Sequence, residues 1–153
     1  MLTLWRLTKA RYAASAFDGE GARLYGGRWN SPGRAVVYLA GSLALAALEI
    51  LVHVKSQREL GGYVRLRVQA PESLVSDVDA PPPNWQQGRA PDETRAIGDA
   101  WLAGGETLLL RVPSVVIPEE HNYLLNPQHP GFGEVGIGEA TPFSFDPRLL
   151  DRV

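Results

Sequence analysis

Residues 64–68 alternate apolar and polar side chains, and this alternation most limits what the chain can fold into. Valine, leucine and valine at 64, 66 and 68 are separated by two arginines. A period of two is typical of a β-strand with one face buried and the other in water. Further short apolar segments bounded by turn residues predict more strands. These cover residues 2–7 (with Leu2, Leu4 and Leu7 facing inward), 35–39, 108–112, 115–117 and 142–145.

Two segments predict helices between these strands. Ser42 is a suitable N-cap for a helix over residues 43–59, and residues 92–103 form a second candidate, closed by a Gly-Gly pair. Because strands and helices do not strictly alternate, the sequence predicts a single α+β domain over residues 1–153. The expected core face of the first helix is formed by Leu45, Leu48, Leu51 and Val52.

Composition excludes several classes of protein. The chain has no cysteine, so it forms no disulfide, zinc-thiolate site or thiol nucleophile. Its net charge of −2 argues against direct binding of nucleic acid or an anionic membrane surface. The longest apolar stretch, residues 43–54, is interrupted by Glu49 and His53 and is too short to cross a bilayer. The first residues lack a signal-peptide pattern. We therefore expect a cytoplasmic protein that binds no membrane.

The motif Gly26-Gly27-Arg28-Trp29-Asn30 lies in a glycine-rich segment, residues 17–33, that is typical of a loop. Two glycines allow the backbone to approach a ligand closely, and the arginine offers a rigid fork of donors for phosphate or carboxylate. A lone arginine is more often a solvated or ion-paired residue, but a loop position favours function. For Trp29 we expect a core position. The motif predicts a site for a charged small molecule.

Glu49 is the second candidate, because a carboxylate between Leu48 and Ile50 must be paired, protonated or near water. Arg28 would be its partner if the helix packs beside the loop, and a helix-surface glutamate is the alternative. His53 lies one turn further along the helix, but no third ligand has a suitable spacing. We therefore expect no metal site.

Ser114 follows Pro113 between two apolar segments. The chain has no Gly-x-Ser-x-Gly motif, which argues against a serine hydrolase, and neither of the common glycine-rich nucleotide-binding signatures is present. A hydrogen bond to a ligand or to the backbone is the expected role of this serine.

Together these motifs resemble the RES domain family, which is named for an arginine, a glutamate and a serine that fall here on Arg28, Glu49 and Ser114. The resemblance extends from about residue 5 to the 145–149 segment, essentially the whole chain. The motifs that carry it are Trp5-Arg6, Gly26-Gly27-Arg28-Trp29-Asn30, Val37-Tyr38-Leu39-Ala40, Leu48-Glu49, Val112-Pro113-Ser114 and Asn122-Tyr123-Leu124-Leu125-Asn126-Pro127-Gln128-His129-Pro130.

This resemblance implies a toxin of a bacterial type II toxin–antitoxin pair with a fold like that of the diphtheria-toxin-like ADP-ribosyltransferases. It implies cleavage of the nicotinamide–ribose bond of NAD, which is a substrate, with no cofactor. It also implies a hetero-oligomer with a Xre-like antitoxin, through which alone the toxin would reach DNA. By matching positions, the catalytic residues are Glu49, Arg28 and Tyr38, and the NAD-binding residues are Arg6, Arg28, Tyr38 and Ser114.

The residue chemistry agrees with these roles. Arginines pair with pyrophosphate oxygens, and a carboxylate stabilises the positive charge that develops on ribose as nicotinamide leaves. Tyr38 offers a flat face for the nicotinamide ring. The acceptor stays open between water, phosphate and a protein side chain, so hydrolysis, phosphorolysis and ADP-ribosylation of a host protein are alternatives. A non-catalytic nucleotide- or protein-binding module is a further alternative. A ribonuclease fits poorly, because no histidine pair has a suitable arrangement.

Overall fold

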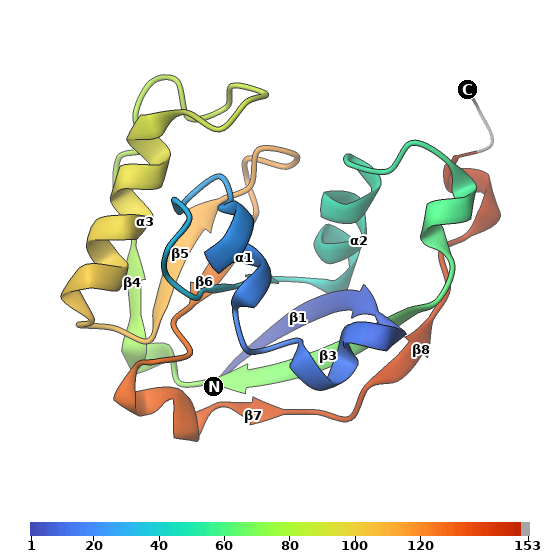
Figure 1. The fold of residues 1–153 in the computed structure, drawn as a ribbon, viewed down its shortest axis with the longest axis horizontal. Coiled ribbons are helices and arrows are strands. Elements are labelled where there is room, and N and C mark those ends of the chain that lie inside the picture. The colour runs from blue at the N-terminus through green and yellow to red at the C-terminus, as the bar shows by residue number, and fades with distance from the viewer. Residues whose placement is uncertain (151–153) are drawn as a thin grey trace.

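The computed structural model describes residues 1–150, and within them the chain forms one curved, largely antiparallel sheet (Figure 1). The strand order is β4-β5-β6-β2-β1-β3-β7, with β8 paired to β3 and a parallel pair at β4–β5. The predicted α+β class is confirmed. The strands are β1 (Leu2–Lys9), β2 (Val37–Ala40), β3 (Tyr63–Ala70), β4 (Val75–Asp77), β5 (Leu109–Pro113), β6 (His121–Leu125), β7 (Gly136–Ile137) and β8 (Thr141–Phe143).

Three α-helices pack around this sheet. Figure 1 shows α3 on one flank beside β4 and β5, α2 on the other flank, and α1 between them. Five short 3-10 turns complete the described chain. The helices are α1 (Glu20–Tyr25), α2 (Leu43–Leu51) and α3 (Asp92–Gly104), and the turns are η1 (Ala10–Ser15), η2 (Gln57–Leu60), η3 (Glu72–Leu74), η4 (Pro130–Glu134) and η5 (Pro147–Leu149).

The alternating segment forms the strand that the sequence predicts. Val64, Leu66 and Val68 are buried on β3, and the arginines between them are exposed. β3 pairs along its whole length with β1. Leu4 and Leu7 are buried on β1, as expected, and Leu2 is partly buried against the same core.

The core is divided between the two flanks. On one flank α3 packs on β5 and β6, and Trp29 is buried there with 2 % of its surface exposed, as expected. On the other flank α2 packs on β1 and β2 through Leu45 and Ala46. Ser42 caps α2 as predicted, since its Oγ accepts a hydrogen bond from the Leu45 backbone N–H at 3.1 Å.

The predicted length and core face of the first helix were wrong. α2 ends at Leu51 instead of residue 59, and a capping box of Ser56 and Glu59 then begins the separate turn η2. Leu48 and Val52 are exposed, at 37 % and 59 %. The side chains that pack inward with Leu45 form a different stripe with the spacing i, i+3, i+4, i+7. Because nearly every residue of this helix is apolar, the sequence does not distinguish this stripe from the predicted one. The observed stripe is Leu43, Ala46, Ala47 and Ile50.

Other expectations also need correction. Residues 115–117 form a turn instead of a strand, and the next strand along the chain, which pairs antiparallel with β5, is β6, which begins at His121. The glycine-rich segment 17–33 contains α1 as well as loop. Within the described residues, no helix is long and apolar enough to cross a membrane. The predicted domain, residues 1–153, includes three residues that lie outside the described part.

Candidate functional site

The Gly26–Asn30 motif forms a tight loop directly after α1. Gly26 ends the helix with φ +73°, a left-handed backbone conformation that favours glycine. At Gly27 a Cβ atom would lie 2.7 Å from the Tyr38 hydroxyl, so a side chain does not fit. Gly27 and Asn30 then pair in an isolated antiparallel β-bridge. The glycines thus let the loop fold back on β2 and present Arg28.

Helix α3 fixes the other side of this loop. Gly98 lies directly against the Trp29 carbonyl, because a Cβ at this position would be 1.6 Å from that oxygen. The buried Thr94 hydroxyl donates to the Arg28 carbonyl at 2.6 Å, and Asp99 accepts from the Ser31 backbone N–H at 2.8 Å. Three contacts from one helix therefore hold the backbone from Arg28 to Ser31.

Tyr38 holds the loop from the side of the sheet. Its hydroxyl donates to Asn30 Oδ1 at 2.7 Å and accepts from the Trp29 backbone N–H at 3.1 Å. Burial of this hydroxyl raises the pKa of Tyr38 well above its ordinary value, so the group stays protonated. In this structure the hydroxyl is therefore engaged in supporting the Arg28 loop.

The Arg28 guanidinium contacts the backbone of a distant segment. Nη1 donates to the carbonyls of Trp85 at 3.1 Å and Gln87 at 2.6 Å, and Nη2 donates to that of Gly88 at 3.2 Å. A guanidinium carries five N–H donors. Among the described residues, three of the Arg28 donors have a partner, so two remain for a ligand. Partial burial lowers the pKa of Arg28, and attraction to Glu49 opposes that shift.

Arg6 bonds to the scaffold through two of its five N–H donors. Its Nε donates to the Ala16 carbonyl at 2.7 Å and its Nη1 to the Tyr38 carbonyl at 3.1 Å, so it links β1 to β2 and to the end of η1. Burial lowers the pKa of Arg6, and Asp18 partly offsets this.

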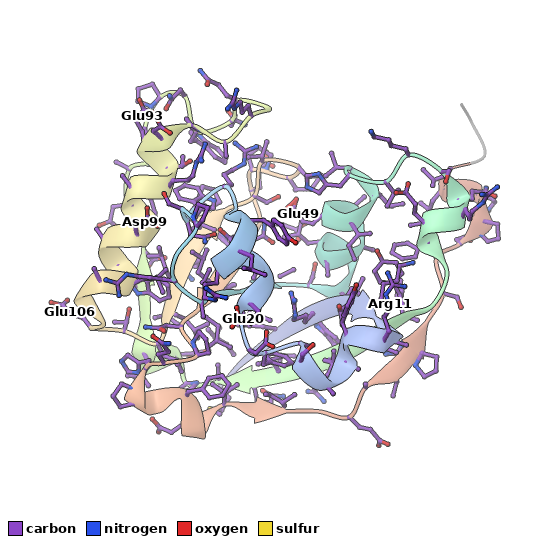
Figure 2. All side chains as sticks on the ribbon, in the orientation of Figure 1. Arg11, Glu20, Glu49, Glu93, Asp99 and Glu106 are labelled. Carbon is purple, nitrogen blue, oxygen red and sulfur yellow. The ribbon has the colours of Figure 1, made fainter. Side chains whose placement is uncertain are left out.

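Glu49 lies on α2, on the side toward α1 (Figure 2). Its Oε2 accepts a short hydrogen bond from the side-chain amide of Asn122 on β6. Arg28 is near enough to attract this carboxylate, but among residues 1–150 the two form no ion pair, so the direct partner is the amide.

A cavity of about 530 Å³ opens beside Glu49. Lys9, Arg11, Glu49, His53, Glu59 and Tyr63 line it, so it lies between the end of β1 and α2. Lys9 is held over the Tyr63 ring, 4.5 Å from the ring centre, and donates to two backbone carbonyls. In the part of the chain that the structure describes, no group of three His, Cys, Asp or Glu is placed to hold a metal ion.

Ser114 is fully buried at the end of β5. Its Oγ accepts hydrogen bonds from the backbone N–H groups of Val116 and Ile117, each at 3.1 Å, and its own N–H donates to the Glu120 carbonyl at 3.0 Å. The serine therefore ties the turn that joins β5 to β6. Of the two roles expected for it, the backbone contact is the one that the structure contains.

The structure brings Arg28, Tyr38 and Glu49 to one region and places Arg6 and Ser114 in its support. Sequence reasoning gave no site role to Thr94, Gly98, Asp99 and Asn122. Gly98 had a readable signal, since a glycine inside a helical pattern often marks a close backbone contact. Asn122 begins one of the motifs that carry the family resemblance, but its contact with Glu49 spans 73 residues and was not predictable from local sequence.

Comparison with known proteins agrees with the resemblance. The RES domain family matches residues 3–146. "Toxin Res" of Yersinia enterocolitica is 40 % identical over 152 residues, which cover 97 % of this chain and 99 % of that protein. The "Prs ADP-ribosylating toxin" of Sphingobium sp. is 36 % identical over 158 residues, which cover 98 % of each chain.

Among solved structures, the fold is similar to a chain of the M. tuberculosis MbcT–MbcA toxin–antitoxin complex. The TM-score is 0.76 at 22 % sequence identity, and the match covers 93 % of this chain and 84 % of that chain. This likeness shows a shared fold.

Proposed function

The chain belongs to the RES domain family, and from this premise we propose that it is a toxin of a type II toxin–antitoxin pair that cleaves the nicotinamide–ribose bond of NAD. The observation that carries the proposal is that two charged side chains with unused hydrogen-bonding capacity lie in one region. Arg28 has two N–H donors left over, and Glu49 has one oxygen held by an amide. They attract each other without forming an ion pair.

In this proposal Arg28 binds the pyrophosphate. Its two remaining donors suit a pair of phosphate oxygens, and the three carbonyl contacts keep the guanidinium from rotating. Holding NAD at its pyrophosphate places the nicotinamide ribose at a fixed distance from the anchor. Arg6 and Tyr38 act through the scaffold, since their polar groups fasten the strand and loop that carry Arg28.

Glu49 supplies the electrostatic part of the reaction. The electron pair of the C1′–N bond leaves with nicotinamide, which departs as a neutral molecule, and positive charge develops on the ribose. A fixed carboxylate stabilises that charge more in the transition state than in bound NAD. The acceptor then bonds to C1′: water or a protein side chain releases a proton to solvent, and phosphate bonds through an oxygen that already carries negative charge.

The acceptor enters, we propose, through the cavity beside Glu49. Lys9 and Arg11 in its wall are balanced by Glu49 and Glu59, so water and phosphate both remain candidate acceptors. ADP-ribosylation of a protein is the second candidate, and the name of the Sphingobium relative favours it. Both reactions share the first step, in which nicotinamide is released.

The proposed partner is an antitoxin of the Xre-like type that covers or enters this region. The support is the family and a structural neighbour solved as a toxin–antitoxin complex. An antitoxin that binds far from Arg28 and Glu49 and leaves NAD turnover intact would contradict this part.

The experiment is incubation of purified protein with NAD, with and without phosphate, and with a cell extract. Released nicotinamide is quantified, and the ribose product is identified by mass spectrometry. We expect nicotinamide release in at least one of these conditions, and the condition that supports release together with the product identifies the acceptor as water, phosphate or protein. Expression without antitoxin should also arrest growth and deplete cellular NAD. Folded protein that releases no nicotinamide would overturn the proposed function.

A further inference from the structure

We propose that Asn122 is a positioning residue for the reaction, which holds one oxygen of Glu49 so that the other faces the substrate, and that Ser114 acts through it. This inference rests on the proposed function, because it assigns the residues that orient the carboxylate used there.

The first step is the fixed position of the amide. Asn122 lies in β6, which is paired on both sides, opposite Ala40 of β2 and Val112 of β5. A strand with two paired neighbours has little freedom to shift. Its side-chain Nδ2 donates to Glu49 Oε2. The carboxylate is therefore tied to a strand that is held on both edges.

The second step is the mobility that this contact removes. Glu49 is half-exposed on a helix of nine residues, and glutamate has three rotatable side-chain bonds. Among residues 1–150 Asn122 is the hydrogen-bond donor to this carboxylate. Without it, the side chain would sample several rotamers, and few of them would face a ribose held at Arg28.

The third step concerns charge. An arginine or lysine in the place of Asn122 would fix the carboxylate and also neutralise it. A neutral amide fixes it and leaves the negative charge for a cationic ribose. The choice of an amide donor thus suits a carboxylate that must stabilise positive charge.

The last step links Ser114 to this contact. The buried Oγ of Ser114 organises the turn before β6, and the backbone of Ser114 is bonded across the turn to Glu120. Asn122 follows two residues later. The turn therefore fixes where β6 begins, and with it the position of the amide. This gives the family's serine a role that requires no contact with NAD.

The test is a double-mutant cycle on nicotinamide release. Asn122→Ala should lower kcat by about tenfold or more, with KM for NAD changed by less than about threefold and an unchanged melting temperature. In a Glu49→Gln background the same change should cost little more, because its effect passes through the carboxylate. His121→Ala, an exposed neighbour on the same strand, is the matched control and should retain activity.

Ser114→Ala gives the second arm. If Ser114 acts through Asn122, the variant loses kcat, keeps its KM for NAD, and adds little in an Asn122→Ala background. A rise in KM alone would indicate direct NAD binding and would overturn this part. Full kcat in Asn122→Ala would overturn the inference, and so would losses that add to those of Glu49→Gln. In either case, nicotinamide release by the wild type would still support the proposed function. A wild-type protein that releases no nicotinamide would overturn both.

Discussion

The backbone carbonyl of Trp29 lies directly against the α-carbon of Gly98, with no room for a methyl group between the Arg28 loop and α3. Gly98 shares a buried stripe of α3 with Thr94 and Leu102. The contact explains why a residue unfavourable in helices occupies the middle of α3. It also makes the loop and the helix one rigid unit.

Gly98→Ala tests this contact. Glycine to alanine in a helix usually stabilises by about 0.5–1 kcal/mol, but here the new Cβ forces α3 away from the loop. We expect a net loss of about 1–3 kcal/mol in the free energy of unfolding, measured by denaturant titration. Gly104→Ala, in the same helix with open space around it, is the control and should be neutral or stabilising. Equal stability of the two variants would contradict the packing described here.

Arg28→Lys tests the guanidinium fork. Lysine keeps the charge but cannot serve three carbonyls and also bind a phosphate in a bidentate way. We expect nicotinamide release to fall by about tenfold or more, or about 1.4 kcal/mol in transition-state binding. Arg34→Lys, at an exposed position of the following loop, should leave the rate unchanged. An unaffected rate in Arg28→Lys would mean that Arg28 has a purely structural role.

Tyr38→Phe tests the buried hydroxyl. The change leaves Asn30 Oδ1 and the Trp29 N–H without their partner, so we expect a loss of about 1–3 kcal/mol in the free energy of unfolding. Tyr25→Phe, at a side chain that is 83 % exposed, is the control. A stability of Tyr38→Phe equal to the wild type would contradict the network.

The stabilisation that the Tyr38 hydroxyl provides should also depend on pH. Burial raises the pKa of Tyr38 above that of an unfolded tyrosine, about 10. Stability from the protonated hydroxyl is therefore fully present below pH 10 and is lost as the pH rises further, because the unfolded chain releases its proton first. The stability difference between wild type and Tyr38→Phe should narrow as the pH rises above 10. A constant difference would show that the hydroxyl titrates normally.

Glu49→Gln separates chemistry from packing. Glutamine keeps an oxygen that accepts from Asn122, so melting temperature and NAD affinity should change little. Loss of the negative charge should lower nicotinamide release about 100-fold or more. Glu119→Gln, at an exposed position, should behave like the wild type. Full activity of Glu49→Gln would rule out the catalytic assignment, and a large loss of stability would instead indicate a role in charge pairing.

Local signals predicted much of this fold. The alternation of residues 64–68, the N-cap at Ser42 and the helix over residues 92–103 all depend on near neighbours, and the structure confirms them. The core face of α2 was wrong because nearly every residue there is apolar, so two stripes were equally plausible. β6 was missed because it begins with polar residues, whose burial is decided by the strands on either side.

In the candidate site, too, local features could be predicted and distant contacts could not. The Gly26–Asn30 loop was recognisable from its own composition. The partner of Glu49 was not recognisable in this way. Arg28 was predicted because it has the opposite charge, whereas Asn122 reaches the carboxylate only through the pairing of β6 with β2. The supporting contacts of Thr94 and Asp99 likewise depend on how α3 packs on a loop more than sixty residues earlier.

The strand order has a consequence for synthesis of the chain. β1 and β2 are made first but lie in the middle of the sheet, and the neighbour of β2 is β6, near the end of the chain. Contacts this distant in sequence form late in folding. A nascent chain therefore carries Glu49 for most of its translation before β6, which holds that carboxylate, emerges. The unfinished protein on the ribosome has the side chains of the candidate site but not their arrangement, so we expect truncated products to lack the proposed activity.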